Sequence, residues 1–264
     1  MRPLAEFPLA QRNRIRGVLF DIDDTLTTGG RLTAPAYAAM EQLHRAGLLA
    51  IPVTGRPAGW CDHIARMWPV DAVVGENGAF YFRYDPAARK MVRRYVSSAG
   101  QRAVDRERLA AIREQILSEV PGCAVAADQH YRETDLAIDY CEDVTHLPPA
   151  AVEKIVGLMQ QAGLTAKVSS IHVNGWFGSY DKLSMAKTLL SDCSGIALEA
   201  CKDVFVFVGD SPNDAPMFAF FPYAVGVANI RAFGGQLTAH PAYVTQAASG
   251  AGFCELVDFL LAAR

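Results

Sequence analysis

The chain has 264 residues, of which 51% are hydrophobic, and a net charge of −3. A chain of this length can form a large α/β core, or a core with one inserted domain of roughly 100 residues. The pI of about 6.1 excludes the strongly basic surface expected of a protein that binds nucleic acid or an anionic membrane. The basic stretch at residues 93–108 is interrupted by acids, so we expect a solvated face there.

The remaining composition points to an ordinary cytoplasmic protein. No apolar stretch reaches the ~20 residues needed to cross a bilayer, and residues 1–16 lack the apolar segment of a secretory signal. The six cysteines show no CxxC spacing, so we expect reduced thiols rather than a zinc site or disulfides. Residues 1–13 are predicted to form a loosely ordered tail.

Short apolar runs that end abruptly at glycine, aspartate or threonine predict the strands of one sheet: residues 17–20, 49–53, 72–74 and 204–208. Such runs without polar alternation are typical of strands covered on both faces, as in a parallel sheet. An amphipathic helical pattern at residues 35–46 separates the first two runs. This alternation predicts an α/β fold with a Rossmann-like, doubly wound parallel sheet.

The middle of the chain has a different pattern. Helices are predicted at residues 105–120 and 149–162, with strands before, between and after them. Apolar residues alternate with polar or small ones at 136–140, which predicts a strand with one exposed face. We therefore predict a core formed by residues 14–83 and 179–264, and an inserted α+β domain at residues 84–178.

Three carboxylates follow the first predicted strand directly: Asp21, Asp23 and Asp24. Acids are also common in turns and helix caps, but neighbouring like charges are costly beside apolar mass. An aspartate can attack phosphorus and hold the phosphoryl group as an acyl phosphate, which is the role we assign to Asp21. Asp23 is the candidate general acid and base. For Asp24 we expect a structural role.

Two further segments offer groups that bind anions. Thr54 and Gly55 follow the second predicted strand, where a hydroxyl and free backbone N–H groups can hold phosphate oxygens. Lys182 would lie in the first turn of a helix capped by Asp181. A lysine there opposes the helix dipole, which indicates an anionic partner. Taken alone, each also fits an ordinary turn or a surface lysine.

The last strand ends at Asp210, and Asp214 follows four residues later. Magnesium prefers oxygen ligands, and Asp21, the backbone carbonyl of Asp23, and Asp210 are the candidate donors. Asp214 would act through water or orient Lys182. The alternative is simple capping of a helix. Each of these motifs has such an alternative, but their joint occurrence at strand and helix boundaries predicts a magnesium site.

Together these segments resemble the four motifs of the haloacid dehalogenase superfamily: Asp21-Ile22-Asp23-Asp24-Thr25, Thr54-Gly55-Arg56, Lys182 and Gly209-Asp210-Ser211-Pro212-Asn213-Asp214. The large insert and Glu76-Asn77-Gly78-Ala79 resemble the branch with a type C2B cap, which includes Cof-like sugar phosphatases, sucrose-phosphate phosphatase and mannosyl-3-phosphoglycerate phosphatase. Many Cof-like members have glycine after the motif lysine, whereas this chain has Leu183.

The resemblance implies a mobile cap, Mg²⁺, and hydrolysis of a phosphate monoester through a phosphoryl-aspartate. It also implies phosphate contacts from Asn213. Arg56 and Asn77 are further substrate candidates. In the insert, His172, Asn174 and Trp176 would share one face of a strand, which suits a polyhydroxylated leaving group. The alternative for these three is a partly buried strand whose polar groups are satisfied within the cap.

The expected function is therefore phosphatase activity on a small phosphorylated metabolite, a sugar phosphate in particular. A phosphomutase of the same superfamily is the alternative, since it uses the same pair of carboxylates. A non-catalytic binding protein is a third reading. A dehalogenase is disfavoured, because Asp23 would have no leaving oxygen to protonate. The sequence does not predict the oligomeric state.

Overall fold

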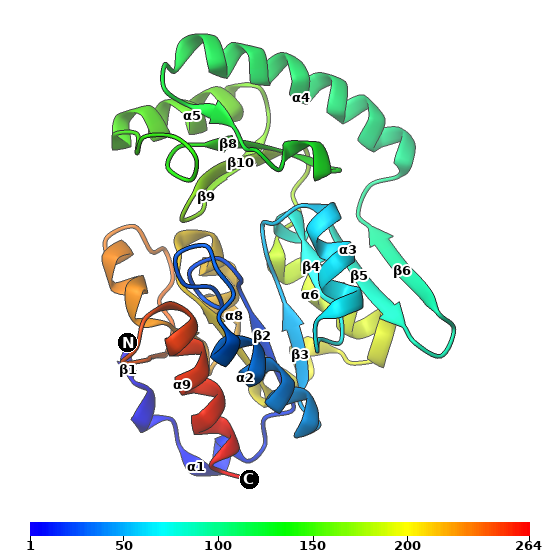
Figure 1. Cartoon of the computed structure of the whole chain (residues 1–264), viewed down its shortest axis with the longest axis vertical. Helices are drawn as coiled ribbons and strands as arrows, with labels where there is room; N and C mark the ends of the chain where they lie inside the picture. Colours follow the sequence, from blue (N-terminus) through cyan, green and yellow to red (C-terminus); the bar gives the residue numbers. More distant parts are fainter.

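A six-stranded parallel sheet forms the centre of the larger domain (Figure 1). The computed structural model describes residues 1–264. The strands lie in the order β1-β13-β12-β11-β2-β3, and every neighbouring pair is parallel. Their bounds are β1 Arg2–Pro3, β2 Gly17–Phe20, β3 Leu49–Pro52, β11 Phe205–Gly209, β12 Val225–Gly226 and β13 Tyr243–Val244.

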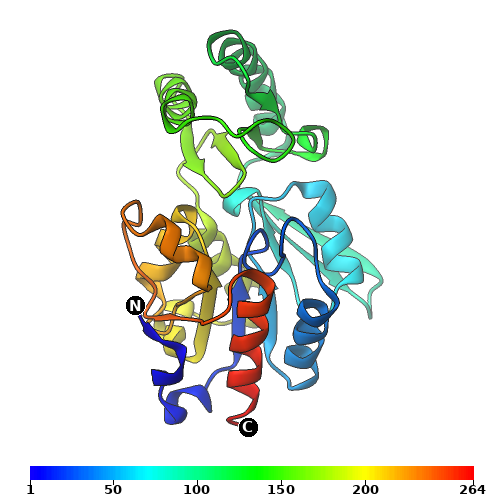
Figure 2. The same cartoon turned by 60° about the vertical axis from the view of Figure 1, so that its left-hand side comes forward.

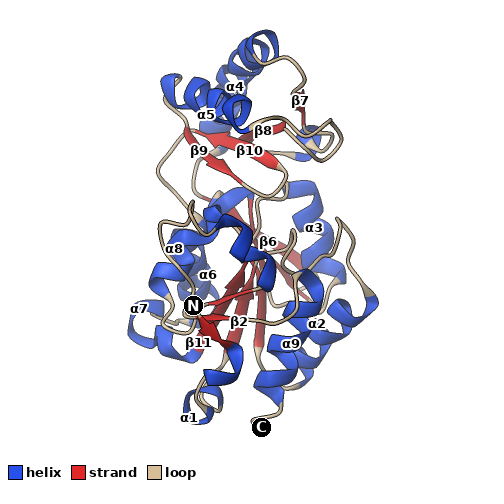
Figure 3. Ribbon diagram, turned by 90° about the vertical axis from the view of Figure 1, so that its left-hand side faces the viewer, coloured by secondary structure: helices blue, strands red, loops and turns tan.

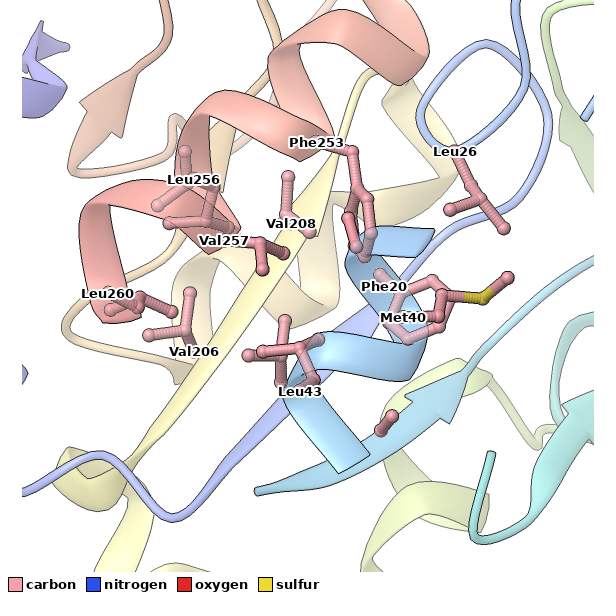
Figure 4. Close-up of a cluster of buried hydrophobic side chains, with 14 of the residues drawn as sticks. Phe20, Leu26, Met40, Leu43, Val206, Val208, Phe253, Leu256, Val257 and Leu260 are labelled. Carbon is pink, nitrogen blue, oxygen red and sulfur yellow. The ribbon is translucent and has the colours of Figure 1, made fainter. Parts of the chain in front are cut away.

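Helices cover both faces of this sheet, as predicted (Figure 3). Along β2, Val18 and Phe20 pack on one face with helices α2 (Ala34–Arg45) and α9 (Ser249–Leu261), as Figure 4 shows for the centre of this cluster. Leu19 packs on the other face with α6 (Lys182–Ser194) and α8 (Ala215–Phe220). Because alternate residues of a strand point to opposite faces, an uninterrupted apolar strand needs both layers.

A three-stranded antiparallel sheet extends the core: β4 (Val73–Gly75), β5 (Phe80–Asp85) and β6 (Lys90–Tyr95). A parallel bridge between Val53 and Val74 joins it to the end of β3, and α3 (Ala58–Met67) covers it. This corrects the predicted start of the insert at residue 84. The hairpin of β5 and β6 pairs along its whole length and stays with the core, so the cap begins after β6.

The cap is a four-stranded antiparallel sheet in the order β7-β8-β10-β9, with two helices on its outer face (Figure 2). Its elements are α4 Ala99–Glu119, β7 Ala124–Val125, β8 Asp135–Asp139, α5 Pro149–Gln161, β9 Thr165–Val168 and β10 His172–Trp176. All of β8 is buried. Its polar face, predicted to be exposed, instead faces the junction with the core. The predicted fold class, a Rossmann-like core with an α+β insert, is confirmed.

The N-terminal residues are packed, contrary to the predicted loose tail. β1 pairs with β13, and Leu4 and Phe7 are buried in the core. Phe7 stacks on Tyr243 with ring centroids 4.9 Å apart, and Arg2 donates to the hydroxyl of Tyr243 at 2.8 Å. The sequence offered too short an apolar pattern to reveal this pairing.

The remaining elements are short: α1 Leu9–Arg12, α7 Leu198–Cys201, and 3-10 helices at Leu4–Glu6, Glu76–Gly78, Gln129–Tyr131, Lys202–Val204, Pro212–Asp214 and Ala228–Phe233. All six cysteines are free thiols. None of the helices combines the length and the apolar character that crossing a bilayer requires.

Phe253 provides a test of the core packing. Its side chain is fully buried on α9, and its ring lies 5.0 Å from that of Phe20. We expect Phe253→Ala to lower the free energy of unfolding by about 3–5 kcal/mol, because the substitution removes buried apolar surface and leaves a cavity. Leu9 is 55% exposed, so Leu9→Ala is the control, with an expected change within about 0.5 kcal/mol. Urea denaturation followed by circular dichroism measures both, and equal effects would contradict this packing.

Candidate active site

The candidate site lies where the carboxyl ends of the core strands face the cap. A small cavity opens there, and Ile171 is the one hydrophobic residue among those that line it. The lining residues are Asp21, Asp23, Gly55, Arg56, Arg132, Ser169, Ser170, Ile171, His172, Asn174, Ser211 and Asn213. The crevice outside the carboxyl ends of the strands is the usual ligand site of an open α/β sheet.

Lys182 joins the first and last motifs. Its Nζ lies 2.6 Å from Asp21 Oδ1 and 2.7 Å from Asp214 Oδ1, and its side chain is 2% exposed. The helix start is fixed by a capping box, in which the Asp181 carboxylate accepts from Ser184 N at 2.8 Å. Lys182 therefore projects from the first helical turn onto buried carboxylates, as the sequence predicted.

The loop after β11 holds two carboxylates in fixed positions. Asp210 accepts from Thr25 Oγ1 at 3.2 Å and from Asn229 Nδ2 at 3.1 Å. Asp214 Oδ2 accepts from the backbone N–H of Asp210 at 3.1 Å, while its other oxygen contacts Lys182. A Cβ atom at Gly209 would clash with the Asp214 carboxylate. Glycine is thus required where the strand ends.

The donor set fits a divalent cation. One oxygen each from Asp21, Asp210 and Asp214 lies within 4.8 Å of the others, and all three residues are buried. Three carboxylates beside the one ammonium group of Lys182 leave an excess of two negative charges. Burial raises the pKa of Asp21 to about 7 against the opposing charge of Lys182. Burial also raises the pKa of Asp210, and the charges of Asp21 and Asp214 add to this effect. Magnesium would balance these charges with the oxygen ligands that it prefers.

Arg56 holds the second carboxylate of the first motif. Its Nε and Nη2 donate to Asp23 at 3.0 Å and 2.8 Å. Thr54 is fully buried, and its Oγ1 accepts from the backbone N–H of Arg56 at 3.0 Å. Gly55, rather than Thr54, lines the cavity. The Thr54 hydroxyl still has its own proton to donate to a ligand. The assignment of Thr54 to phosphate binding stays a prediction.

Of the cap candidates, His172 and Asn174 line the cavity. Asn174 is fixed by a 2.8 Å bond from its Nδ2 to Asp135 Oδ2. Trp176, expected on the same face, is 1% exposed and stacks on Tyr180 near the junction with the core, with ring centroids 5.6 Å apart. Trp176 does not line this cavity, and its assignment to substrate contact stays a prediction.

Asn77 also lies outside the main cavity. It lines a neighbouring pocket with Trp176, Lys182 and Asn213. Its backbone is left-handed, with φ of 55°, and a Cβ atom at Gly55 would come 3.2 Å from Asn77 Nδ2. Asn77 therefore supports the Gly55 loop from behind, and Asn213 is shared by the two pockets.

Two residues dock the cap on the core: Arg132, which sequence reasoning missed, and Glu76, whose motif it noted without this role. Arg132 Nη1 donates to the backbone carbonyl of Gly55 at 2.9 Å and to Asp135 at 3.1 Å. Glu76, fully buried in the core, accepts from the cap backbone at Glu133 N (2.9 Å) and Thr134 N (2.7 Å). The sequence signal that could have indicated these contacts is the run of charged residues just before β8, which is unusual beside a buried strand.

Comparison with known proteins gives one curated relative with a named activity. The chain is 26% identical to a phosphoglycolate phosphatase of Methanothrix thermoacetophila, and the match covers 94% of this chain and 98% of that protein. No family model matches the chain.

Solved structures share the fold over nearly their whole length. A HAD/COF-like hydrolase from Plasmodium vivax superimposes with a TM-score of 0.68 at 16% identity, covering 97% of this chain and 100% of that one. The sucrose-phosphatase from Synechocystis gives a TM-score of 0.62 at 14% identity, with coverages of 93% and 98%. The chain therefore has the fold of these hydrolases, which is the fold that its four motifs indicated.

Proposed function

We propose that the protein is a magnesium-dependent phosphatase that hydrolyses a small phosphate monoester through a phosphoryl group on Asp21. The observation that carries this proposal is the contact of Lys182 with both Asp21 and Asp214 in a buried group of carboxylates beside Asp210. The phosphatases among the compared proteins support it.

In the first step, a carboxylate oxygen of Asp21 attacks phosphorus. A bond forms between that oxygen and phosphorus, and the bond from phosphorus to the leaving oxygen breaks. Asp23 gives its proton to the leaving oxygen. In the second step, Asp23 takes a proton from water, the water oxygen attacks phosphorus, and the Asp21 carboxylate leaves.

Lys182 supplies a fixed positive charge to both steps. Because it is buried and already held by Asp21 and Asp214, it needs no rearrangement when substrate arrives. Bound magnesium would neutralise the charge of Asp21 and of the phosphoryl oxygens, which otherwise repel each other. Asp21, Asp210 and Asp214 would hold it, with the backbone carbonyl of Asp23 as the further donor that the sequence predicted.

Asp23 is engaged before substrate binds. While its oxygens accept from Arg56, it is not free to give a proton to a leaving group. Productive binding therefore requires Asp23 to exchange at least one Arg56 contact for the leaving oxygen.

The polar lining of the cavity favours a sugar phosphate as substrate. The leaving group would meet hydroxyl, amide and imidazole groups of Ser169, Ser170, Asn174 and His172, which suit a hydroxylated molecule. Phosphoglycolate, which names the curated relative, is the second candidate, because Arg56 and Arg132 also line the cavity and an arginine binds a carboxylate well.

A phosphomutase would use the same two carboxylates but return the phosphoryl group to the organic product. The two activities differ in their products, since a mutase yields an isomer of the sugar phosphate and a phosphatase yields inorganic phosphate. A non-catalytic binding protein would show neither. All four motifs contain the residue types that the proposed chemistry needs, so none of them favours a non-catalytic binding protein.

Replacing the nucleophile tests the mechanism. We expect Asp21→Asn to lower kcat by at least about 10³-fold, because an amide oxygen is a poor nucleophile toward phosphorus. Asp24→Asn on the same loop is the matched control, since asparagine tolerates the left-handed backbone there (φ 54°). Phosphate release measures turnover, and a fully active Asp21→Asn variant would reject the mechanism.

Metal removal tests the cation site. We expect EDTA to abolish turnover and added Mg²⁺ to restore it. Asp210→Asn removes one charged ligand, so we expect half-maximal activity to require at least about tenfold more Mg²⁺. Turnover measured against Mg²⁺ concentration gives both results, with Asp203→Asn, which is remote on the surface, as the control. Full activity in EDTA would contradict the proposed cation.

A substrate panel tests the leaving-group class. It contains hexose and pentose phosphates, phosphoglycolate and p-nitrophenyl phosphate, assayed with Mg²⁺ for both free phosphate and isomerised product. We expect the highest kcat/KM with a sugar phosphate. A preference for phosphoglycolate would reassign the substrate, and an isomer without free phosphate would identify a mutase.

A further inference from the structure

Glu142 lies at the edge of the active site and contacts both domains. It follows β8 in the cap, and its Oε1 accepts from Arg56 Nη2 of the core at 3.0 Å. Its Oε2 lies 2.9 Å from His172 Nε2 of the cap, outside hydrogen-bond geometry. Arg56 and His172 line the cavity, whereas Glu142 stands behind them.

The loop that carries Glu142 is held rigidly. The carboxylate of Asp139 accepts from the backbone N–H groups of Cys141, Glu142 and Asp143 at 2.9, 2.7 and 2.8 Å. Three charge-assisted bonds to one carboxylate fix the backbone of a short loop. The position of Glu142 relative to the cap sheet is therefore set by the cap alone, before any contact with the core.

Arg56 is shared between a catalytic candidate and Glu142. Its Nη2 lies 2.8 Å from Asp23 Oδ1 and 3.0 Å from Glu142 Oε1. The face of its guanidinium lies over the Trp60 ring, 4.5 Å from the centroid. When Asp23 turns toward a leaving oxygen, Glu142 and Trp60 still hold Arg56 where it is.

We propose that Glu142 is a positioning residue of the phosphatase reaction: it contacts Arg56 only when the cap is closed, and there it holds Arg56 and His172 toward the leaving group. This inference rests on the proposed function. If Glu142 has this role, the leaving-group site is complete only when the cap is closed, because Arg56 is on the core and Glu142 is on the cap. Before closure, Arg56 lacks Glu142, whereas His172 stays beside Glu142 because both residues are on the cap.

The electrostatics agree with this geometry. The close approach of His172, followed by the charge of Arg56, lowers the pKa of Glu142 to about 2. Glu142 is thus ionised throughout the neutral range, and its contact with Arg56 does not vary with pH there. The carboxylate is partly open to solvent, with 30% of its side chain exposed, whereas 6% of the Arg56 side chain is exposed. Glu142 can therefore leave Arg56 for water when the cap opens.

The test compares Glu142→Ala, Glu142→Gln and the matched control Asp143→Asn, an exposed acid on the same loop with no ion pair. Each is assayed with the compound of the panel, p-nitrophenyl phosphate included, that gives the highest kcat/KM in the unaltered protein. We expect Glu142→Ala to lower kcat/KM by about 10- to 100-fold, as for loss of a hydrogen bond to a charged group. Glu142→Gln keeps one acceptor oxygen and should lose less, and Asp143→Asn should change by less than about threefold.

Arg56→Ala and the double variant Arg56→Ala/Glu142→Ala separate positioning from general stability. If Glu142 acts mainly through Arg56, the double variant is no slower than Arg56→Ala, whereas an independent structural role gives additive losses. Additive losses, or a Glu142→Ala variant as active as Asp143→Asn, would overturn the proposal. If the unaltered protein hydrolyses no compound, or Asp21→Asn remains active, the proposed function fails instead.

Discussion

The site depends on the balance of charge around Lys182. Asp21, Asp210 and Asp214 are brought together by two separate segments, the loops after β2 and β11, and burial removes the water that would otherwise screen their repulsion. One buried ammonium group offsets only part of this charge. The shortage of positive charge is what makes a divalent cation the fitting ligand, and a cation bound there would in turn attract an anionic phosphoryl group. The helix cap at Asp181 and the glycine at position 209 serve this arrangement by fixing its geometry.

The junction between cap and core contains buried polar contacts beside an apolar cluster in which Trp176 of the cap packs with residues of the core. The contacts of Arg56 with Glu142, and of Arg132 with the Gly55 carbonyl, join the two domains through arginine side chains that are almost fully buried. Glu76, fully buried in the core, adds hydrogen bonds from the cap backbone at Glu133 and Thr134.

The sequence predicted the elements that end at the site, and it failed where pairing across domains decided the outcome. Asp21, Lys182 and Asp210 were found because each stands at the boundary of a strand or helix with a strong local pattern. Arg132 and Glu142 were missed, because their partners lie 77 and 86 residues away and no local pattern encodes such contacts. Strand periodicity placed Trp176 on the same face as His172 and Asn174, but it could not show that Trp176 lines a neighbouring pocket with Lys182 rather than the main cavity.

The pairing of β1 with β13 has a consequence for solubility. A parallel sheet ends in a row of unpaired backbone N–H and C=O groups, which can recruit a strand from another molecule. Here the outermost strand has only two residues, Arg2 and Pro3. Proline lacks the N–H that a further strand would need, and arginine is charged, so the sheet ends in a strand to which another molecule adds poorly. The first residues of the chain thus act as a guard against self-association through the sheet.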